Sequence, residues 1–255
     1  MPLCALPESG TILRSVIMLC APAEIEAQNL LPALYDGTKL QNALDKYKME
    51  KPSRRLTELF EAYSKSLVET EPLRAFSIAD AFNTDDVLLE AARHLLKSPV
   101  LSWPLSIPEL GIASATRYHQ LVRYFQRSTV AATAVLGDWA AEDDAYSGGC
   151  SIQGCSAPTN ITAPILILQL KGVNKKSYIH SRYPANHVTK GELNEILARA
   201  PGGDIFESAK KVLMDASECV CNGSLRSREI FVDECVKDFA FQVGEALSTV
   251  SFHES

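Results

Sequence analysis

The side chains best suited to chemistry in this chain of 255 residues are its thiols. Four of the seven cysteines fall into two pairs, Cys150 with Cys155 and Cys219 with Cys221. Thiolates are favoured ligands of Zn²⁺, which takes four soft or borderline ligands in a tetrahedron at structural sites. The second pair is separated by a single residue, which is tighter than common zinc knuckles, and free cysteine usually packs as a small buried hydrophobe. We therefore expect no metal site, and these four cysteines remain the candidates for a zinc- or thiol-dependent alternative.

Nucleophilic catalysis requires a thiol or hydroxyl beside a base that a third group orients. No Gly-x-Ser-x-Gly elbow or cysteine-protease signature surrounds any of the histidines: His94, His119, His180, His187 and His253. The glycine-rich stretch at 147–154 lacks the Lys-Ser/Thr ending of a phosphate-binding loop. We expect no catalytic residue, no cofactor-binding residue and no cofactor, and we predict that the chain is not an enzyme.

The overall charge argues against broad electrostatic binding. The formal net charge is −6, and the pI is near 5.5, whereas nucleic acid and anionic membrane surfaces attract an excess of Lys and Arg. One local exception is residues 171–190, which contain five basic residues and two tyrosines but no acidic residue. That composition suits contact with phosphate and a stacked base, but without a wider basic face we interpret it as a solvated arm. We expect no nucleic-acid partner.

The expected compartment follows from the cysteines and from the apolar runs. Seven is an odd number at uneven spacing, which favours reduced thiols over a disulfide framework. No apolar run approaches the roughly 18–20 residues that a membrane-spanning helix needs. We therefore expect a cytoplasmic or nuclear protein with no membrane association.

The elements that would position these groups are mostly helices. Apolar residues at steps of three and four predict helices near 11–19, 25–31 and 39–47, then one with Pro52 in its first turn and one that begins at Pro72. Residues 83–86 supply a cap and first-turn acids for the next helix. A longer helix is expected at 115–135, ending before Gly137, with an apolar face at Tyr118, Leu121, Val122, Phe125 and Val130.

The second half of the chain is predicted in the same way. Residues 165–170 favour a single strand or a hairpin, bounded by Pro164 and Gly172. Two helices follow, and a final helix runs from about 225 to 250, whose repeated apolar residues we assign to a packed core rather than to a partner seam. The predicted division is 1–100 for a helical domain, 101–136 for a helical extension, 137–190 for a linker or inserted arm with one possible strand, and 191–255 for a C-terminal helical region. The predicted fold class is mainly α, with at most a few short strands.

Several stretches of the chain are similar to one known family. Residues 71–79 (EPLRAFSIA) followed by 90–93 (EAAR) carry the most specific likeness. Further likeness is found at residues 6–22, 44–49 (LDKYKM), 113–121 (ASATRYHQL), 216–221 (ASECVC) and Phe239. These segments resemble fungal BTB/POZ domain-containing proteins over residues 3–135 and 190–250. The chain begins where a BTB/POZ domain is already half complete, so the resemblance implies the helical second half of such a domain followed by a helical extension.

The resemblance implies a function in protein–protein interaction, as an adaptor or scaffold. In the family, BTB/POZ proteins can recruit cullin ubiquitin ligases, so a component of such a ligase is the partner that the resemblance implies. The first strands and the helix of the usual dimer interface are absent, which leaves the oligomeric state open. Two alternatives remain: a thiol- or zinc-dependent enzyme or zinc-stabilised binding module, and a truncated fragment without independent function.

Overall fold

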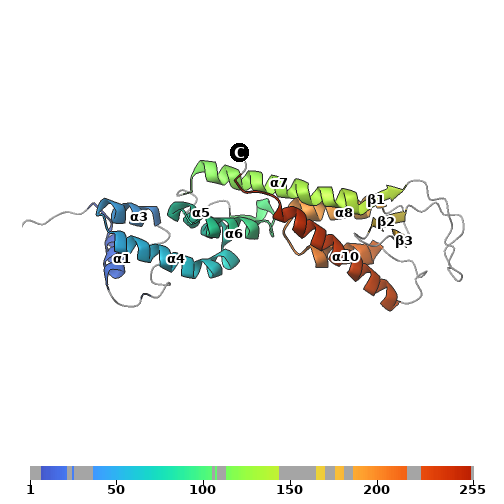
Figure 1. The fold of residues 1–255 in the computed structure, drawn as a ribbon, viewed down its shortest axis with the longest axis horizontal. Coiled ribbons are helices and arrows are strands. Elements are labelled where there is room, and N and C mark those ends of the chain that lie inside the picture. The colour runs from blue at the N-terminus through green and yellow to red at the C-terminus, as the bar shows by residue number, and fades with distance from the viewer. Residues whose placement is uncertain are drawn as a thin grey trace, which may run out of the picture. The chain divides into compact units, whose positions relative to one another are not determined.

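A computed structural model of the chain describes residues 7–21, 25, 37–104, 107, 113–143, 165–169, 176–180, 186–216 and 225–253. Within these ranges the fold is mainly α, as the sequence predicts (Figure 1). The helices of the first half are α1 (Gly10–Cys20), α3 (Gly37–Lys46), α4 (Glu50–Thr70), α5 (Pro72–Phe82) and α6 (Asp85–Leu95), followed by a short 3-10 helix, η1 (Val100–Ser102). The helices of the second half are α7 (Ala115–Trp139), α8 (Asn186–Arg199), α9 (Ile205–Ala216) and α10 (Leu225–Ser248).

The predicted helices correspond closely to these elements. Pro52 lies in the first turn of α4, Pro72 is the first residue of α5, and Asp85 and Asp86 occupy the first turn of α6. The helix predicted near 25–31 lies almost wholly outside the described residues. The prediction that regular structure ends at Gly137 was wrong, because α7 continues through this residue to Trp139. A single glycine costs a helix only about 1 kcal/mol, which packing elsewhere along α7 can offset.

Three short strands lie in the segment that was predicted as a linker or inserted arm. They are β1 (Ala140–Asp143), β2 (Ile165–Gln169) and β3 (Lys176–His180), and they form an antiparallel sheet in the order β1-β2-β3. The register pairs Ala140 with Leu168 and Ile167 with Tyr178. β2 corresponds to the strand that was predicted from the apolar run at 165–170.

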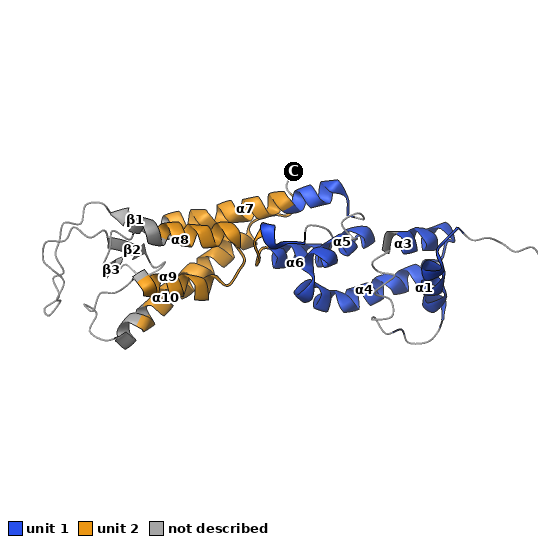
Figure 2. Cartoon of the chain, turned by 180° about the vertical axis from the view of Figure 1, so that it is seen from behind, with its two compact units in different colours: residues 1–95, 101–121 blue, residues 96–100, 122–255 orange. Residues whose placement is uncertain are grey.

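The described contacts divide the chain into two units (Figure 2). Unit 1 comprises residues 1–95 and 101–121, and unit 2 comprises residues 96–100 and 122–255. The first turns of α7 belong to unit 1 and the rest of the helix to unit 2. The four-part division made from the sequence is finer than this grouping and stays a prediction.

Unit 1 is held together by the apolar residues that its helices bury against one another, and α5 is buried on more than one side. Every apolar position that was predicted for α6 is buried, namely Val87, Leu88, Ala91, Ala92 and Leu95. Phe60 of α4 lies with its ring centroid 5.3 Å from that of Phe82 in α5. The end of α1 is closed by Arg55, whose guanidinium donates to the carbonyl oxygens of Leu19 and Ala21. A cation at this position satisfies unpaired carbonyls and complements the negative end of the helix dipole.

The first turn of α7 is fastened within unit 1 by polar contacts. The Ser114 hydroxyl accepts from the backbone N–H of Arg117 at 3.1 Å, which is an N-cap interaction. The Arg117 guanidinium pairs with Asp80 of α5 at 3.3 Å and with Asp85 of α6 at 3.5 Å. Asp80 also accepts from the Ser114 N–H at 2.9 Å. Because all these groups are partly exposed, they position the helix more than they stabilise the fold.

Unit 2 has its own core, built from the later turns of α7 with α8, α9 and α10. Its buried members are Ala132, Leu136, Leu193, Leu197, Ile205, Ala209, Leu213, Val232, Cys235, Val236, Phe239 and Val243. The assignment of the repeated apolar residues of α10 to a core is thereby confirmed. Val130 was wrongly placed on the inner face of α7, since 67% of it is exposed. The small residues Ser128 and Ala132 are buried on that face instead.

The connection between α8 and α9 packs tightly against the residues that follow α6. The N–H of Gly202 donates to the Leu96 carbonyl at 3.0 Å. A Cβ added at Gly202 would lie 2.8 Å from the Cβ of Leu96, which is closer than real Cβ contacts permit. Glycine is therefore required here by the close approach of two backbones.

We expect Gly202→Ala to destabilise the fold by about 1–3 kcal/mol, because the new methyl group forces the backbone of Leu96 to move. The matched control is Gly191→Ala in α8, where a Cβ meets nothing within 4 Å and alanine should stabilise the helix by up to about 1 kcal/mol. Urea unfolding of both variants measures the difference. Equal stability of the two variants would contradict the tight packing at Gly202.

Candidate functional site

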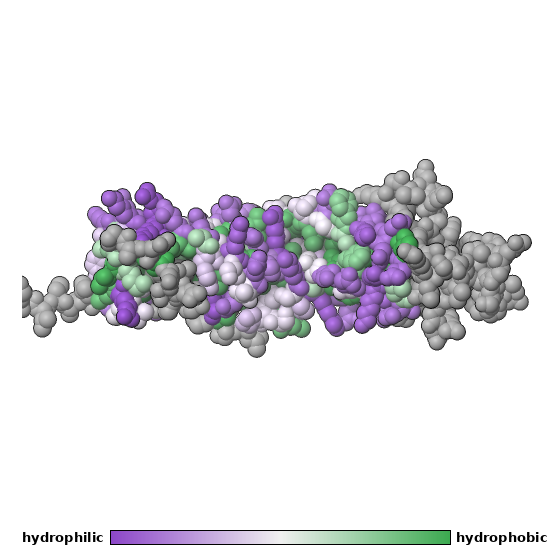
Figure 3. Space-filling model, turned by 90° about the horizontal axis from the view of Figure 1, so that it is seen from below, coloured by the Kyte–Doolittle hydropathy of each residue, from purple (hydrophilic) through white to green (hydrophobic). Residues whose placement is uncertain are grey.

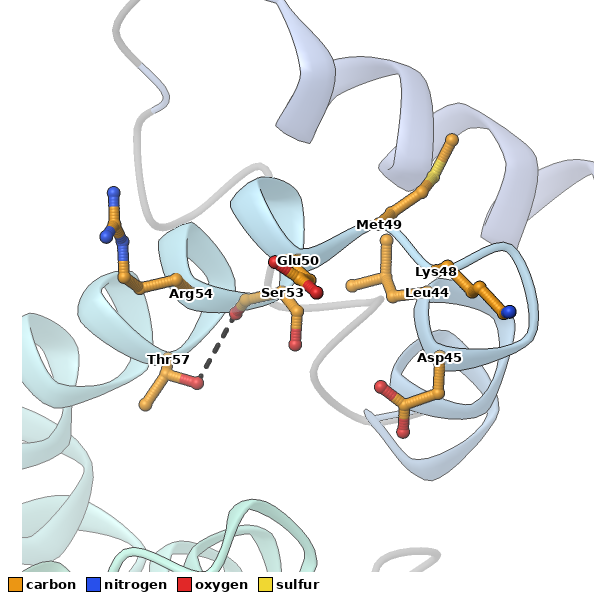
Figure 4. Close-up of a pocket in the computed structure, with 8 residues that line it drawn as sticks. All are labelled: Leu44, Asp45, Lys48, Met49, Glu50, Ser53, Arg54 and Thr57. Atoms are coloured by element: carbon orange, nitrogen blue, oxygen red, sulfur yellow. Dashed lines mark hydrogen bonds between the residues drawn. The ribbon is translucent and has the colours of Figure 1, made fainter.

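A cavity of about 500 Å³ lies where α3 ends and α4 begins (Figure 4). Two of its lining residues are apolar, Leu44 and Met49. The other six are polar or charged: Asp45, Lys48, Glu50, Ser53, Arg54 and Thr57. All eight come from the last turn of α3, the connection after it and the first two turns of α4. The cavity is therefore formed locally, inside unit 1.

The shape of the connection follows from the way α3 terminates. Lys48 has a φ of 51°, in the left-handed region that non-glycine residues seldom adopt. The Lys48 N–H donates to the Asp45 carbonyl at 3.0 Å, and the Met49 N–H donates to the Leu44 carbonyl at 2.8 Å. This pair of hydrogen bonds is the Schellman motif, in which an apolar pair at the positions of Leu44 and Met49 commonly accompanies the left-handed residue. The same motif that stops the helix thus supplies the apolar part of the cavity.

The hydroxyl groups of the cavity are engaged in structural hydrogen bonds. Ser53 accepts from the Gln41 side-chain amide at 2.9 Å, and the Thr57 hydroxyl donates to the Ser53 carbonyl at 3.4 Å. An amide cannot take a proton from a serine, so the contact with Gln41 does not activate Ser53 as a nucleophile. Gln41 also donates to Asp45 at 3.1 Å. This arrangement suits the binding of a polar or amphipathic group better than covalent catalysis.

The charges around the cavity balance. Asp45 and Glu50 are acidic, and Lys48 and Arg54 are basic, so the formal charge of the lining is zero. Arg54 lies 3.5 Å from Glu58 on the next turn of α4, and its side chain remains 78% exposed. Such a rim offers hydrogen-bond donors and acceptors of both signs and has no net attraction for a small anion or cation.

A charged cluster fastens the start of α1 to the end of α3, next to the cavity. Glu8 accepts from the Lys46 ammonium at 2.7 Å and from the Tyr47 hydroxyl at 2.6 Å. The hydrogen bond from Lys46, followed by that from Tyr47, lowers the pKa of Glu8. The hydrogen bond to Glu8 raises the pKa of Lys46 and that of Tyr47. The cluster therefore holds a charged carboxylate, a charged ammonium and a neutral phenol at neutral pH.

The residues that were considered as candidate site residues from the sequence do not line the cavity. The zinc candidates Cys150, Cys155, Cys219 and Cys221 lie outside the described residues, as does half of the basic stretch at 171–190. His94 and His119 lie on α6 and α7, the helical positions that the sequence predicted for them. The cavity residues were not predicted as a site, although the apolar residues Leu44 and Met49 at the end of a predicted helix fit the apolar contact of a Schellman ending.

Two thiols lie within the described part of the chain. Cys20 is exposed at the end of α1, and Cys235 is buried in the core of unit 2. Burial, with Glu234 and Asp238 as further causes, raises the pKa of the Cys235 thiol to about 12. A thiol this hard to ionise is a poor nucleophile and metal ligand. Among the described residues, no three side chains of the His, Cys, Asp and Glu types converge in a way that could hold a metal ion.

Comparison of the chain with protein-family models, with curated proteins and with solved structures finds no significant match. Within the described ranges, no helix is both long enough and apolar enough to cross a membrane.

The left-handed turn at the cavity can be tested through Lys48. We expect Lys48→Gly to stabilise the fold by about 0.5–1 kcal/mol, because glycine adopts a φ of 51° without steric cost. Lys48→Ala removes the same charge and retains the strain, so it should give no such gain. Thermal or urea unfolding compares the two variants, and a glycine variant less stable than the alanine variant would contradict a left-handed Lys48.

The Glu8 cluster predicts a pH dependence of stability. Because the pKa of Glu8 is lowered on folding, its contribution is present above its ordinary value of 4.5 and is lost as the pH falls through the folded pKa. We expect the urea midpoint of Glu8→Gln to fall less between pH 5 and pH 3 than that of the wild type. The decrease should become smaller but should not vanish, because other carboxylates also titrate in this range. Glu61→Gln, on the exposed surface of α4, is the control and should keep the wild-type slope. An unchanged slope in Glu8→Gln would argue against the cluster.

Proposed function

We propose that this chain is a non-catalytic protein-interaction module of the adaptor or scaffold kind, which acts in the cytoplasm or nucleus. The observation that carries the proposal is the composition of the cavity between α3 and α4. Small-molecule sites are lined mainly by apolar and aromatic side chains, whereas this lining has two apolar residues, six polar ones and no aromatic ring. A small apolar centre inside a polar rim is the usual anatomy of a protein–protein interface.

The surface and the helical fold support the same function. Hydrophilic side chains are interspersed with apolar ones over the described part of the face in Figure 3. Large apolar side chains that remain exposed include Ile17 on α1 and Leu101 in η1, both in unit 1. Exposed residues of this kind lose contact with water when a partner covers them. The resemblance to BTB/POZ proteins, whose domains are docking platforms, points to the same class and suggests a cullin ubiquitin ligase component as the partner to try first.

The proposal is tested by asking whether the cavity selects a partner. The full chain, tagged at its C-terminus, is expressed in a fungal host, and the proteins that co-purify after a stringent wash are identified. Arg54→Glu reverses one charge on the cavity rim at a side chain that is 78% exposed, so the fold should tolerate it. Lys65→Glu makes the same change on the exposed surface of α4 away from the cavity and is the matched control.

We expect a defined protein to bind the wild type and Lys65→Glu and to bind Arg54→Glu at least about tenfold more weakly, when the purified components are titrated. Equal binding of the wild type and both variants would show that the partner does not bind at the cavity. Recovery of chaperones alone would instead favour a fragment without independent function, and one zinc ion per purified chain would favour the zinc-stabilised alternative.

A further inference from the structure

The two faces of α10 differ in what they contact. One face is buried in the core of unit 2 through Val232, Cys235, Val236, Phe239 and Val243. The opposite face carries two large apolar side chains in solvent, Ile230 at 53% exposure and Phe241 at 65%. Two charged residues, Glu234 and Lys237, are exposed between them. Neither of these two forms an ion pair with another described residue. We call these four exposed residues the outer stripe.

The spacing of the outer stripe keeps its members in one line. Positions 230, 234, 237 and 241 advance by four, three and four residues, which are the steps that hold side chains on one side of an α-helix. With a rise of 1.5 Å per residue, Ile230 and Phe241 are about 16 Å apart along the axis. The stripe is thus three turns long, with an apolar residue at each end and opposite charges in the middle.

The order of residues along the outer stripe makes it complementary to a second outer stripe that runs in the opposite direction. Consider a second copy of α10 that lies antiparallel, with a two-fold axis between positions 235 and 236. Ile230 then faces Phe241 of the second copy, and Glu234 faces Lys237 of the second copy, and each pair occurs twice. A parallel pairing would oppose Glu234 to itself and Lys237 to itself, which is unfavourable. The charges therefore select the antiparallel orientation.

We propose that this chain forms a two-fold dimer in which the outer stripe of α10 packs antiparallel against the outer stripe of a second copy. Gly244, one turn beyond Phe241, is exposed and has open space around the position of a Cβ, which lets a second helix come close. The interface uses one face of a single helix, so it lies at the low end of specific interface sizes, and the dissociation constant is on the order of 10–100 µM. The dimer is independent of the adaptor role, because it needs no other protein.

The first measurement is sedimentation equilibrium of the full wild-type chain from about 1 to about 500 µM at low salt. A reducing agent is present so that no disulfide links two chains. We expect a reversible monomer–dimer equilibrium within this range. A chain that stays monomeric at every concentration overturns the proposal.

The apolar ends of the stripe are tested by Phe241→Asp. This variant places a carboxylate opposite Ile230 of the second copy and should abolish dimer formation at all concentrations in the range. The matched control is Val130→Asp on α7, which changes an apolar residue of 67% exposure outside the stripe and should leave the dimer intact. Circular dichroism and thermal unfolding check that both variants fold. A dimer that survives Phe241→Asp places the interface elsewhere and overturns the proposal.

The orientation is tested by charge exchange. Glu234→Lys and Lys237→Glu each convert two attractive pairs into two repulsive ones, and each should raise the dissociation constant about tenfold or more. The double variant Glu234→Lys with Lys237→Glu restores both attractive pairs and should return to within about threefold of the wild type. An equimolar mixture of the two single variants should likewise form a mixed dimer. A double variant that remains as weak as either single one overturns the antiparallel pairing.

Discussion

Packing of every short helix against its neighbours is the constraint on which the rest of this structure depends. The helices α1, α3, α5 and α6 are only 10 or 11 residues long, and isolated helices of this length are marginal in water because nucleation is costly. Each must therefore gain its stability from packing against its neighbours. This explains why the apolar positions predicted for the inner face of α6 are buried, and why Phe60 and Phe82 meet where α4 and α5 pack together.

A chain of short helices has many helix ends, and the structure satisfies these ends by different means. Arg55 donates to the last carbonyls of α1, and Ser114 caps the first turn of α7. Two helices end on a residue in the left-handed region, α3 with Lys48 and α5 with Asn83. Asparagine tolerates this conformation better than lysine. The left-handed conformation therefore costs more free energy at Lys48 than at Asn83, and Lys48 lines the cavity. The local backbone strain thus lies at the candidate site.

The division of helix surface into inner and outer faces also decides where this chain can meet another molecule. Once Val232, Cys235 and Phe239 are committed to the core of unit 2, the face of α10 left to solvent is fixed by helix geometry. That face contains Ile230 and Phe241, the two apolar ends of the outer stripe. In unit 1, polar residues at the start of α4 are exposed beside the apolar pair Leu44 and Met49 at the end of α3. A partner site and a self-association surface can therefore coexist without competing for the same residues.

The sequence by itself determined the mainly helical class, most helix positions and the buried faces of α6 and α10, because these depend on apolar spacing within single segments and on local signals such as Pro52, Pro72 and Asp85. It did not determine the inner face of α7, where Ser128 and Ala132 are buried and Val130 is exposed, because the apolar pattern alone does not show which side of the helix its neighbours cover. It also did not reveal the cavity or the need for Gly202. The cavity is formed within residues 44–57, but it depends on a left-handed backbone at Lys48 that the residue type does not indicate. Tertiary structure alone decided the need for Gly202, because it arises from the approach of two segments that are distant in sequence.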